Sequence, residues 1–130
     1  MASSLKEKDV WKHFHKMWPW HAERQEPGAG FDAGKPDVLL MDHKGVPGLV
    51  ELKAPSRWQL RPSQWIWHER WVKAGGRVCV VACEMYDGDK YPTWYICNMT
   101  RNIISKRKLT RLEIPHTDIE PSLLYYLWSH

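Results

Sequence analysis

The stretch GKPDVLLMDHKGVPGLVELKAP, residues 34–55, decides the fold of this chain. Val38–Met41 is an apolar run of strand length, Asp42–Gly48 supplies turn residues, and Leu49–Ala54 resumes a strand. These features predict a β-hairpin with two antiparallel arms. The hairpin also carries three charged side chains that packing alone does not require: Asp37, Glu51 and Lys53.

The alternation of side chains along a strand predicts where these charges lie. Glu51 and Lys53 should point to one face, roughly 7 Å apart along the strand, while Val50 and Leu52 point the other way into a core. In an antiparallel pair, Asp37 falls opposite the stretch from Glu51 to Lys53. We therefore expect the three charged side chains to share one site.

Two carboxylates at one point repel each other, so Asp37 and Glu51 would cost stability unless a cation lay between them. Oxygen ligands at a tight site suit Mg²⁺ or Mn²⁺. Lys53 could then orient or help deprotonate an attacking water, or stabilise charge on a phosphate. The alternative is a solvated surface pair of Glu51 and Lys53, which is common and contributes about 0–1 kcal/mol. Two apolar arms and a following helix with Gln64 favour the catalytic interpretation.

The remaining segments predict a mixed sheet flanked by helices. Leu5–Met17 has helical periodicity with Ser3 or Ser4 as its cap, and residues 60–76 read as a helix with Pro62 in its first turn and two glycines at its end. The other expected elements are a short strand at residues 21–26, a loop at 27–36, strands at 77–85 and 93–99, a basic irregular segment at 100–111 and a terminal helix at 119–128. The predicted fold class is α/β, with the element order αβββαβ in its core.

The composition bounds the protein class. A chain of 130 residues suits one domain, so we take residues 1–130 as a single unit. We see no signal peptide and no apolar run long enough to cross a bilayer, which predicts a cytoplasmic protein. The net charge of +4 favours a polyanionic partner. The three cysteines lie in apolar stretches without metal-ligand spacing, which predicts buried free thiols.

The stretches GKPDVLL, GLVELKAP and LRPSQWIWHERWVKAGGRVCVV resemble the PD-(D/E)xK nuclease superfamily. More narrowly, they are similar to the small stand-alone virus-type replication-repair nuclease (VRR-NUC) domains of phages and bacteria. That family pattern runs G-x-P-D, E-x-K, a helix bearing Gln, and a strand after a glycine turn. The similarity covers about half the chain, from Arg24 to Ala82. It implies a restriction-endonuclease-like core, and a location in a bacterial cell, or in the host cytoplasm if a phage encodes the protein.

The resemblance also implies roles for individual residues. Asp37 and Glu51 would bind the metal together with the backbone carbonyl of Leu52, Lys53 would be the catalytic lysine, and Gln64 would lie beside the site. An upstream acid often completes such a centre, and two residues are candidates: Glu7 on the first helix and Glu26 before the glycine-rich loop. Glu26 follows Arg24 in an R-x-E pattern like that of phage members. The sequence does not separate the two, and either could be a solvated surface residue.

Basic residues near the hairpin are candidates for phosphate contacts. Lys35 lies inside the G-x-P-D pattern, and Arg57 and Arg61 flank Trp58 after the hairpin. A second basic cluster lies in the irregular segment and consists of Lys106, Arg107 and Lys108. It could bind the DNA backbone at a distance from the cleavage site, or it could be a solvated surface.

One histidine also lies near the predicted site. His68 follows Gln64 by four residues on one helical face. From that position it could reach a substrate, or it could be a structural histidine that is hydrogen-bonded inside the protein.

These residues lead us to expect a Mg²⁺- or Mn²⁺-dependent DNA endonuclease that hydrolyses phosphodiester bonds. The resemblance to stand-alone family members implies cleavage of branched DNA by a homodimer, as in a Holliday-junction resolvase, with no role for a membrane. One alternative is a monomeric flap nuclease or nickase. Another is an inactive DNA-binding or recruiting module of the same fold, and a third is a subunit controlled by a larger repair complex.

Overall fold

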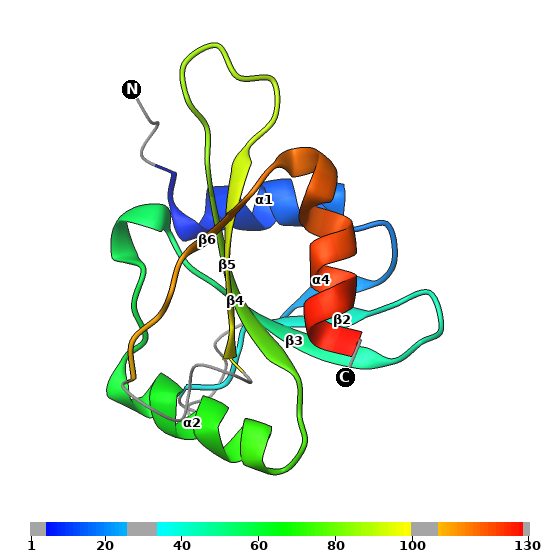
Figure 1. Cartoon of the computed structure of the whole chain (residues 1–130), viewed down its shortest axis with the longest axis vertical. Helices are drawn as coiled ribbons and strands as arrows, with labels where there is room; N and C mark the ends of the chain where they lie inside the picture. Colours follow the sequence, from blue (N-terminus) through cyan, green and yellow to red (C-terminus); the bar gives the residue numbers. More distant parts are fainter. Residues whose placement is uncertain (1–4, 26–33, 100–106, 129–130) are drawn as a thin grey trace.

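The computed structural model describes residues 5–25, 34–99 and 107–128. In this part of the chain the structure is of the α/β class, with three α-helices, six β-strands and two short 3₁₀ turns (Figure 1). The elements, in chain order, are α1 (Glu7–Met17), β1 (Ala22–Arg24), β2 (Val38–Met41), β3 (Pro47–Leu52), η1 (Pro55–Arg57), α2 (Pro62–Lys73), β4 (Val78–Glu84), β5 (Thr93–Asn98), β6 (Leu112–Ile114), η2 (His116–Asp118) and α4 (Ile119–Trp128).

The six strands form one mixed sheet in the order β1-β2-β3-β4-β5-β6. All neighbouring pairs are antiparallel except β3 and β4, which run parallel. A parallel pair needs a long crossover, and α2 supplies it between these two strands. The β2–β3 hairpin predicted from the sequence is confirmed, with Val38 opposite Val50 and Leu39 opposite Leu49.

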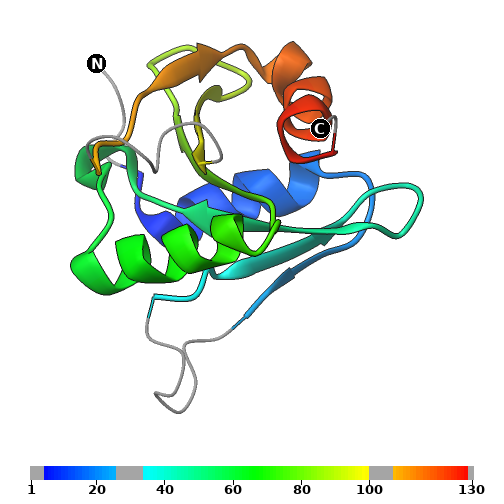
Figure 2. The same ribbon diagram turned by 60° about the horizontal axis from the view of Figure 1, so that its bottom comes forward.

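The sheet buries both of its faces, and β4 shows this directly. Its residues alternate between two apolar clusters: Cys79, Val81 and Cys83 belong to one, and Val78 and Val80 to the other. The first cluster also contains residues of α1 and α4, and the second contains residues of α2. Helix α2 therefore covers the face opposite α1 and α4, and Figures 1 and 2 both show it well apart from α4.

Several sequence predictions hold in this structure. The short strand in residues 21–26, the crossover helix, the two following strands and the terminal helix are all present. The three cysteines are buried and form no disulfide within the part of the chain that the structure describes, as expected. Helix α4 packs on the body of the protein through Ile119, Leu123 and Leu127. Among the described residues, no helix has the length and apolar character needed to span a bilayer.

Helix α1 and strand β3 have boundaries that differ from the sequence predictions. Helix α1 begins at Glu7, because the chain at Lys6 is extended and its N–H donates to Asp9 Oδ2 at 3.1 Å; Ser3 and Ser4 lie outside the described residues. Strand β3 runs from Pro47 to Leu52, so it starts two residues earlier than predicted and ends two earlier. Proline is tolerated as the first residue of a strand, which the turn assignment overlooked.

The basic segment at residues 100–111 was predicted to be irregular, and its first part lies outside the described residues. After it, β6 adds a short edge strand that the sequence did not predict. Only three residues pair with β5, and two of them are exposed. A strand this short has too few residues for its alternation to be recognised.

Candidate metal centre

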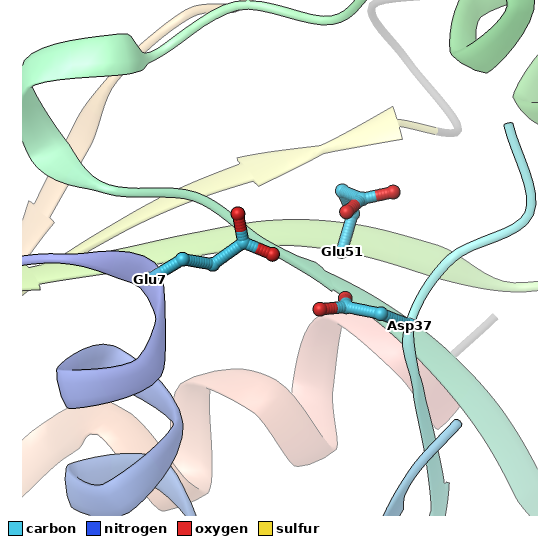
Figure 3. A group of neighbouring side chains, drawn as sticks. All are labelled: Glu7, Asp37 and Glu51. Atoms are coloured by element: carbon cyan, nitrogen blue, oxygen red, sulfur yellow. The ribbon is translucent and has the colours of Figure 1, made fainter. Parts of the chain in front are cut away.

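Three carboxylates from separate elements converge at one end of the β2–β3 hairpin. Glu7 lies in the first turn of α1, Asp37 directly precedes β2, and Glu51 is the penultimate residue of β3. One oxygen of each lies within 4.8 Å of the others, a spacing that could hold a metal ion. Figure 3 shows the three side chains pointing toward one another.

The hairpin register explains why Asp37 and Glu51 meet. Because Val38 pairs with Val50, the residue before β2 lies beside Glu51, as the sequence predicted. The backbone N–H of Leu52 donates to Asp37 Oδ1 at 3.0 Å and fixes that carboxylate. Asp37 Oδ2 is buried and has no hydrogen-bond partner among the described residues. A buried carboxylate oxygen without a partner is costly, and a bound cation would satisfy it.

The electrostatics of the cluster also favour a cation. Burial, and next to it the charge of Glu51, raises the pKa of Asp37 to about 6. Burial raises the pKa of Glu51 to about 7 even though the Lys53 ammonium opposes the shift. Burial and the charge of Asp37 raise the pKa of Glu7 as well. The charge of Glu51 raises the pKa of Asp37, that of Asp37 raises the pKa of Glu7, and that of Glu7 raises the pKa of Glu51, so positive charge at their centre would stabilise all three.

Arg24 supplies part of that positive charge. From strand β1, its Nη2 lies 3.7 Å from Glu7 Oε1 and its Nε lies 3.8 Å from Asp37 Oδ2. Both separations exceed hydrogen-bond length, and the arginine side chain is one-third exposed, so solvent screens the attraction. The R-x-E pattern was a sequence signal for this segment, but it did not indicate that the arginine itself faces the carboxylates.

Gln64 links the lysine to the carboxylates. Lys53 Nζ donates to Gln64 Oε1 at 3.0 Å, and Gln64 Nε2 donates to Glu51 Oε1 at 3.3 Å. The backbone N–H of Arg61 also donates to Gln64 Oε1, at 2.9 Å, which ties the amide to the start of α2. The alternative of a solvated surface pair of Glu51 and Lys53 is wrong, because Glu51 is only 3% exposed and Lys53 is partly buried.

Glu7 provides the upstream acid in the described part of the chain. The sequence left the choice between Glu7 and Glu26 open, and Glu26 lies outside the described residues. The first turn of α1 brings Glu7 to the other two carboxylates although 30 residues separate it from Asp37 in the sequence. The Leu52 carbonyl stays a predicted ligand, whereas the N–H of the same residue holds Asp37.

His68 differs from both roles that its sequence position suggested. Its side chain is completely buried, so it does not reach a substrate. Neither ring nitrogen has a hydrogen-bond partner among the described residues, so this structure does not show the hydrogen-bonded role either. Its Nε2 lies 3.8 Å from Glu51 Oε1. Burial lowers the pKa of His68 to about 4, so the imidazole is neutral at physiological pH and forms no ion pair there.

Gly34 holds the Asp37 segment against α2. Its φ is +93°, a conformation that residues with a side chain rarely adopt, and a Cβ there would overlap the carbonyl oxygen of Ser63 and lie 2.9 Å from the backbone nitrogen of Gln64. The positive φ and the close approach to α2 therefore explain why the G-x-P-D pattern begins with a glycine. It allows the chain that leads to Asp37 to touch the helix that carries Gln64.

We expect Gly34→Ala to destabilise the protein by at least about 1 kcal/mol more than Gly45→Ala. Gly45 is a matched control because its φ is also positive, at +76°, but a Cβ there would have no neighbour within 4 Å. Urea unfolding of both variants measures the difference. Equal losses would mean that backbone conformation alone, and not the contact with α2, requires Gly34.

The predicted phosphate contacts divide into two groups. Lys35, Arg57 and Arg61 are exposed, and all three lie close in sequence to residues of the carboxylate cluster or its helix. Arg107 instead forms a two-pronged pair with Glu69 on α2, at 2.8 and 3.3 Å, and Lys108 is exposed. Lys106 lies outside the described residues.

The donor set of the cluster fits a hard cation, because its ligands are all carboxylate oxygens and one of them is buried without a partner. Comparisons with known proteins add no assignment. No family model, no curated protein sequence and no solved structure matches this chain at a significant level.

Proposed function

We propose that the protein is a divalent-metal-dependent DNA endonuclease of the VRR-NUC type, with a restriction-endonuclease-like core. The observation that carries the proposal is the convergence of Glu7, Asp37 and Glu51 within 4.8 Å, with Lys53 tied to the same cluster through Gln64. The parallel β3–β4 pair with α2 as its crossover is compatible with that core. The sequence resemblance and the geometry arise from the same residues and support the same chemistry.

The three carboxylates would hold Mg²⁺ or Mn²⁺. When bound, such an ion lowers the pKa of a water and stabilises negative charge on phosphate oxygens. The protein contributes a preformed set of oxygens: the Leu52 N–H orients Asp37, and the Gln64 amide orients Glu51. Glu51 is almost completely buried, so little water has to leave it when an ion binds. Its side chain and that of Asp37 are already oriented by these hydrogen bonds.

Lys53 would act on the water or on the phosphate. Its Nζ is held at 3.0 Å by Gln64 Oε1, and the charge of the lysine lowers the pKa of both Glu51 and Glu7. An ammonium in this position can hold an attacking water by a hydrogen bond, or stabilise charge that develops on the phosphate. Gln64 restricts its orientation, so the two residues act together.

DNA would bind through its backbone. Lys35, Arg57 and Arg61 are exposed cations that lie close in sequence to the cluster or to α2, and the net charge of +4 favours a polyanion. Contacts of this kind read phosphate positions and shape, which suits a structure-specific enzyme. We propose branched DNA as the substrate and a homodimer as the active species, since two symmetric active sites can cut two strands.

One experiment separates the candidate functions. Labelled four-way junction, flap, linear duplex and single-stranded DNA are incubated with the protein in Mg²⁺, in Mn²⁺ and in chelator. Asp37→Asn serves as the inactive control. Paired symmetric cuts in the junction alone, lost in chelator and in the variant, support a dimeric resolvase, and sedimentation of a dimer at working concentration supports it further.

The other outcomes have equally definite meanings. Metal-dependent cleavage of flap or duplex by a monomer would keep the active site and replace the substrate assignment with that of a flap nuclease or nickase. Binding of DNA without any cleavage would reject the endonuclease proposal in favour of an inactive module. The buried oxygen of Asp37 that lacks a hydrogen-bond partner argues against that last outcome, because an inactive module gains nothing from it.

A further inference from the structure

His68 is the least explained buried residue of the protein. Its side chain is 0% exposed, and neither Nδ1 nor Nε2 has a hydrogen-bond partner among the described residues. Buried polar groups are nearly always paired, and an exception calls for an explanation. An apolar side chain of similar volume would fill the same space without this cost.

The neighbour that faces the unpaired imidazole is the metal-centre carboxylate Glu51. Gln64 and His68 are four residues apart on α2, so both project from one side of the helix. Gln64 Nε2 already donates to Glu51 Oε1 at 3.3 Å, and His68 Nε2 lies 3.8 Å from the same oxygen. One oxygen of Glu51 therefore faces two groups of α2 that can donate to it.

An imidazole in this position can serve as a hydrogen-bond donor to Glu51. A neutral histidine can carry its proton on Nε2 and donate it to a carboxylate without balancing its charge. Groups that donate to a ligating carboxylate fix its orientation and affect metal affinity. A separation of 3.8 Å is slightly too long for a hydrogen bond, and a small rotation of Glu51 would close it.

We propose that His68 is a positioning residue: its Nε2–H donates to Glu51 Oε1 when a divalent cation occupies the centre, and so holds Glu51 in its ligating orientation. This proposal rests on the proposed metal centre, but it does not depend on which DNA the protein cuts. His68 itself touches neither the cation nor the substrate, and it acts only through Glu51.

The test compares Mn²⁺ affinity and stability in three variants, measured on the full chain without DNA. His68→Leu keeps an apolar side chain of similar size and removes the donor. His68→Gln returns an amide donor near the position of Nε2. Val72→Ala is the control for loss of packing, because Val72 is a partly buried residue on the same helix that packs against the apolar cluster of Trp65 and Val80.

We expect His68→Leu to weaken Mn²⁺ binding by about 10-fold or more without lowering the melting temperature of the metal-free protein. His68→Gln should recover most of the affinity, and Val72→Ala should lower the melting temperature and leave Mn²⁺ binding near that of the wild type. Electron paramagnetic resonance of free Mn²⁺ measures the affinity, and thermal unfolding in chelator measures the stability.

Four results would overturn the proposal. They are equal Mn²⁺ affinity in wild type and His68→Leu, no recovery in His68→Gln, a loss of affinity in Val72→Ala as large as that in His68→Leu, and absence of Mn²⁺ binding in the wild type. The last would also reject the metal centre. Mn²⁺ binding with the expected pattern, but without cleavage of DNA, would support the role of His68 and reject only the endonuclease proposal.

Discussion

The Lys53→Met protein is expected to lose DNA cleavage by at least about 1,000-fold while it still binds Mn²⁺. Lys53 Nζ is held 3.0 Å from Gln64 Oε1, and the same amide contacts Glu51, so the ammonium lies beside the carboxylates at a fixed orientation. Methionine keeps much of the length of the side chain and removes only the charge and its donors. Single-turnover cleavage of the preferred DNA substrate measures the loss.

Lys44→Met is the matched control for this experiment. Lys44 is an exposed lysine in the turn at the opposite end of the same hairpin, and its removal changes the net charge of the protein equally. Its cleavage rate should stay near that of the wild type. If Lys53→Met also cleaved at the wild-type rate, the lysine would serve only to reduce repulsion among the carboxylates. Loss of Mn²⁺ binding in Lys53→Met would mean that the ammonium organises the ligands rather than the reaction.

The hairpin and its charges could be predicted because their cause is local. An apolar run, a turn and a second apolar run fix the register, and the register places Asp37 beside Glu51. The same reasoning put Gln64 near the start of the next helix, where the structure ties it to Glu51 and Lys53. A two-residue error at each end of β3 did not disturb the site, because the pairing of its central residues was right.

The rest of the site depends on contacts between distant elements, which no local pattern encodes. Glu7 was one of two equal candidates, and only the packing of α1 on the sheet brings it to Asp37. The spacing of Gln64 and His68 indicated a shared helical face, but not that the imidazole would be buried without a partner. The close approach of Gly34 to Ser63 likewise depends on tertiary structure, although the glycine itself was visible in the pattern.

The stability of the metal-free protein should fall as the pH rises from about 5 to 8. In the folded protein the pKa of Asp37 is raised from 3.8 to about 6, and that of Glu51 from 4.5 to about 7. The folded state therefore binds protons more tightly than the unfolded state. The stabilisation that results is complete below the unfolded values and is lost as the pH rises through the folded ones.

Glu51→Gln removes the second of these two effects. At pH 8 in chelator we expect it to be more stable than the wild type by up to about 3 kcal/mol, an advantage that shrinks toward pH 5, where the folded wild type is largely protonated at this position. Urea unfolding at the two pH values measures the difference. Glu113→Gln, which removes an exposed carboxylate from β6, should show no such gain.

Adding Mn²⁺ at pH 8 should reverse the order of the two proteins. The wild type gains the free energy of metal binding, whereas Glu51→Gln lacks one ligand and gains much less. A variant that is less stable than the wild type at pH 8 in chelator would mean that Glu51 is satisfied by its protein neighbours and needs no cation. If Glu51→Gln is the more stable protein in chelator and the less stable one in Mn²⁺, then the buried carboxylate of Glu51 destabilises the metal-free fold. Its role would then be to bind the metal ion.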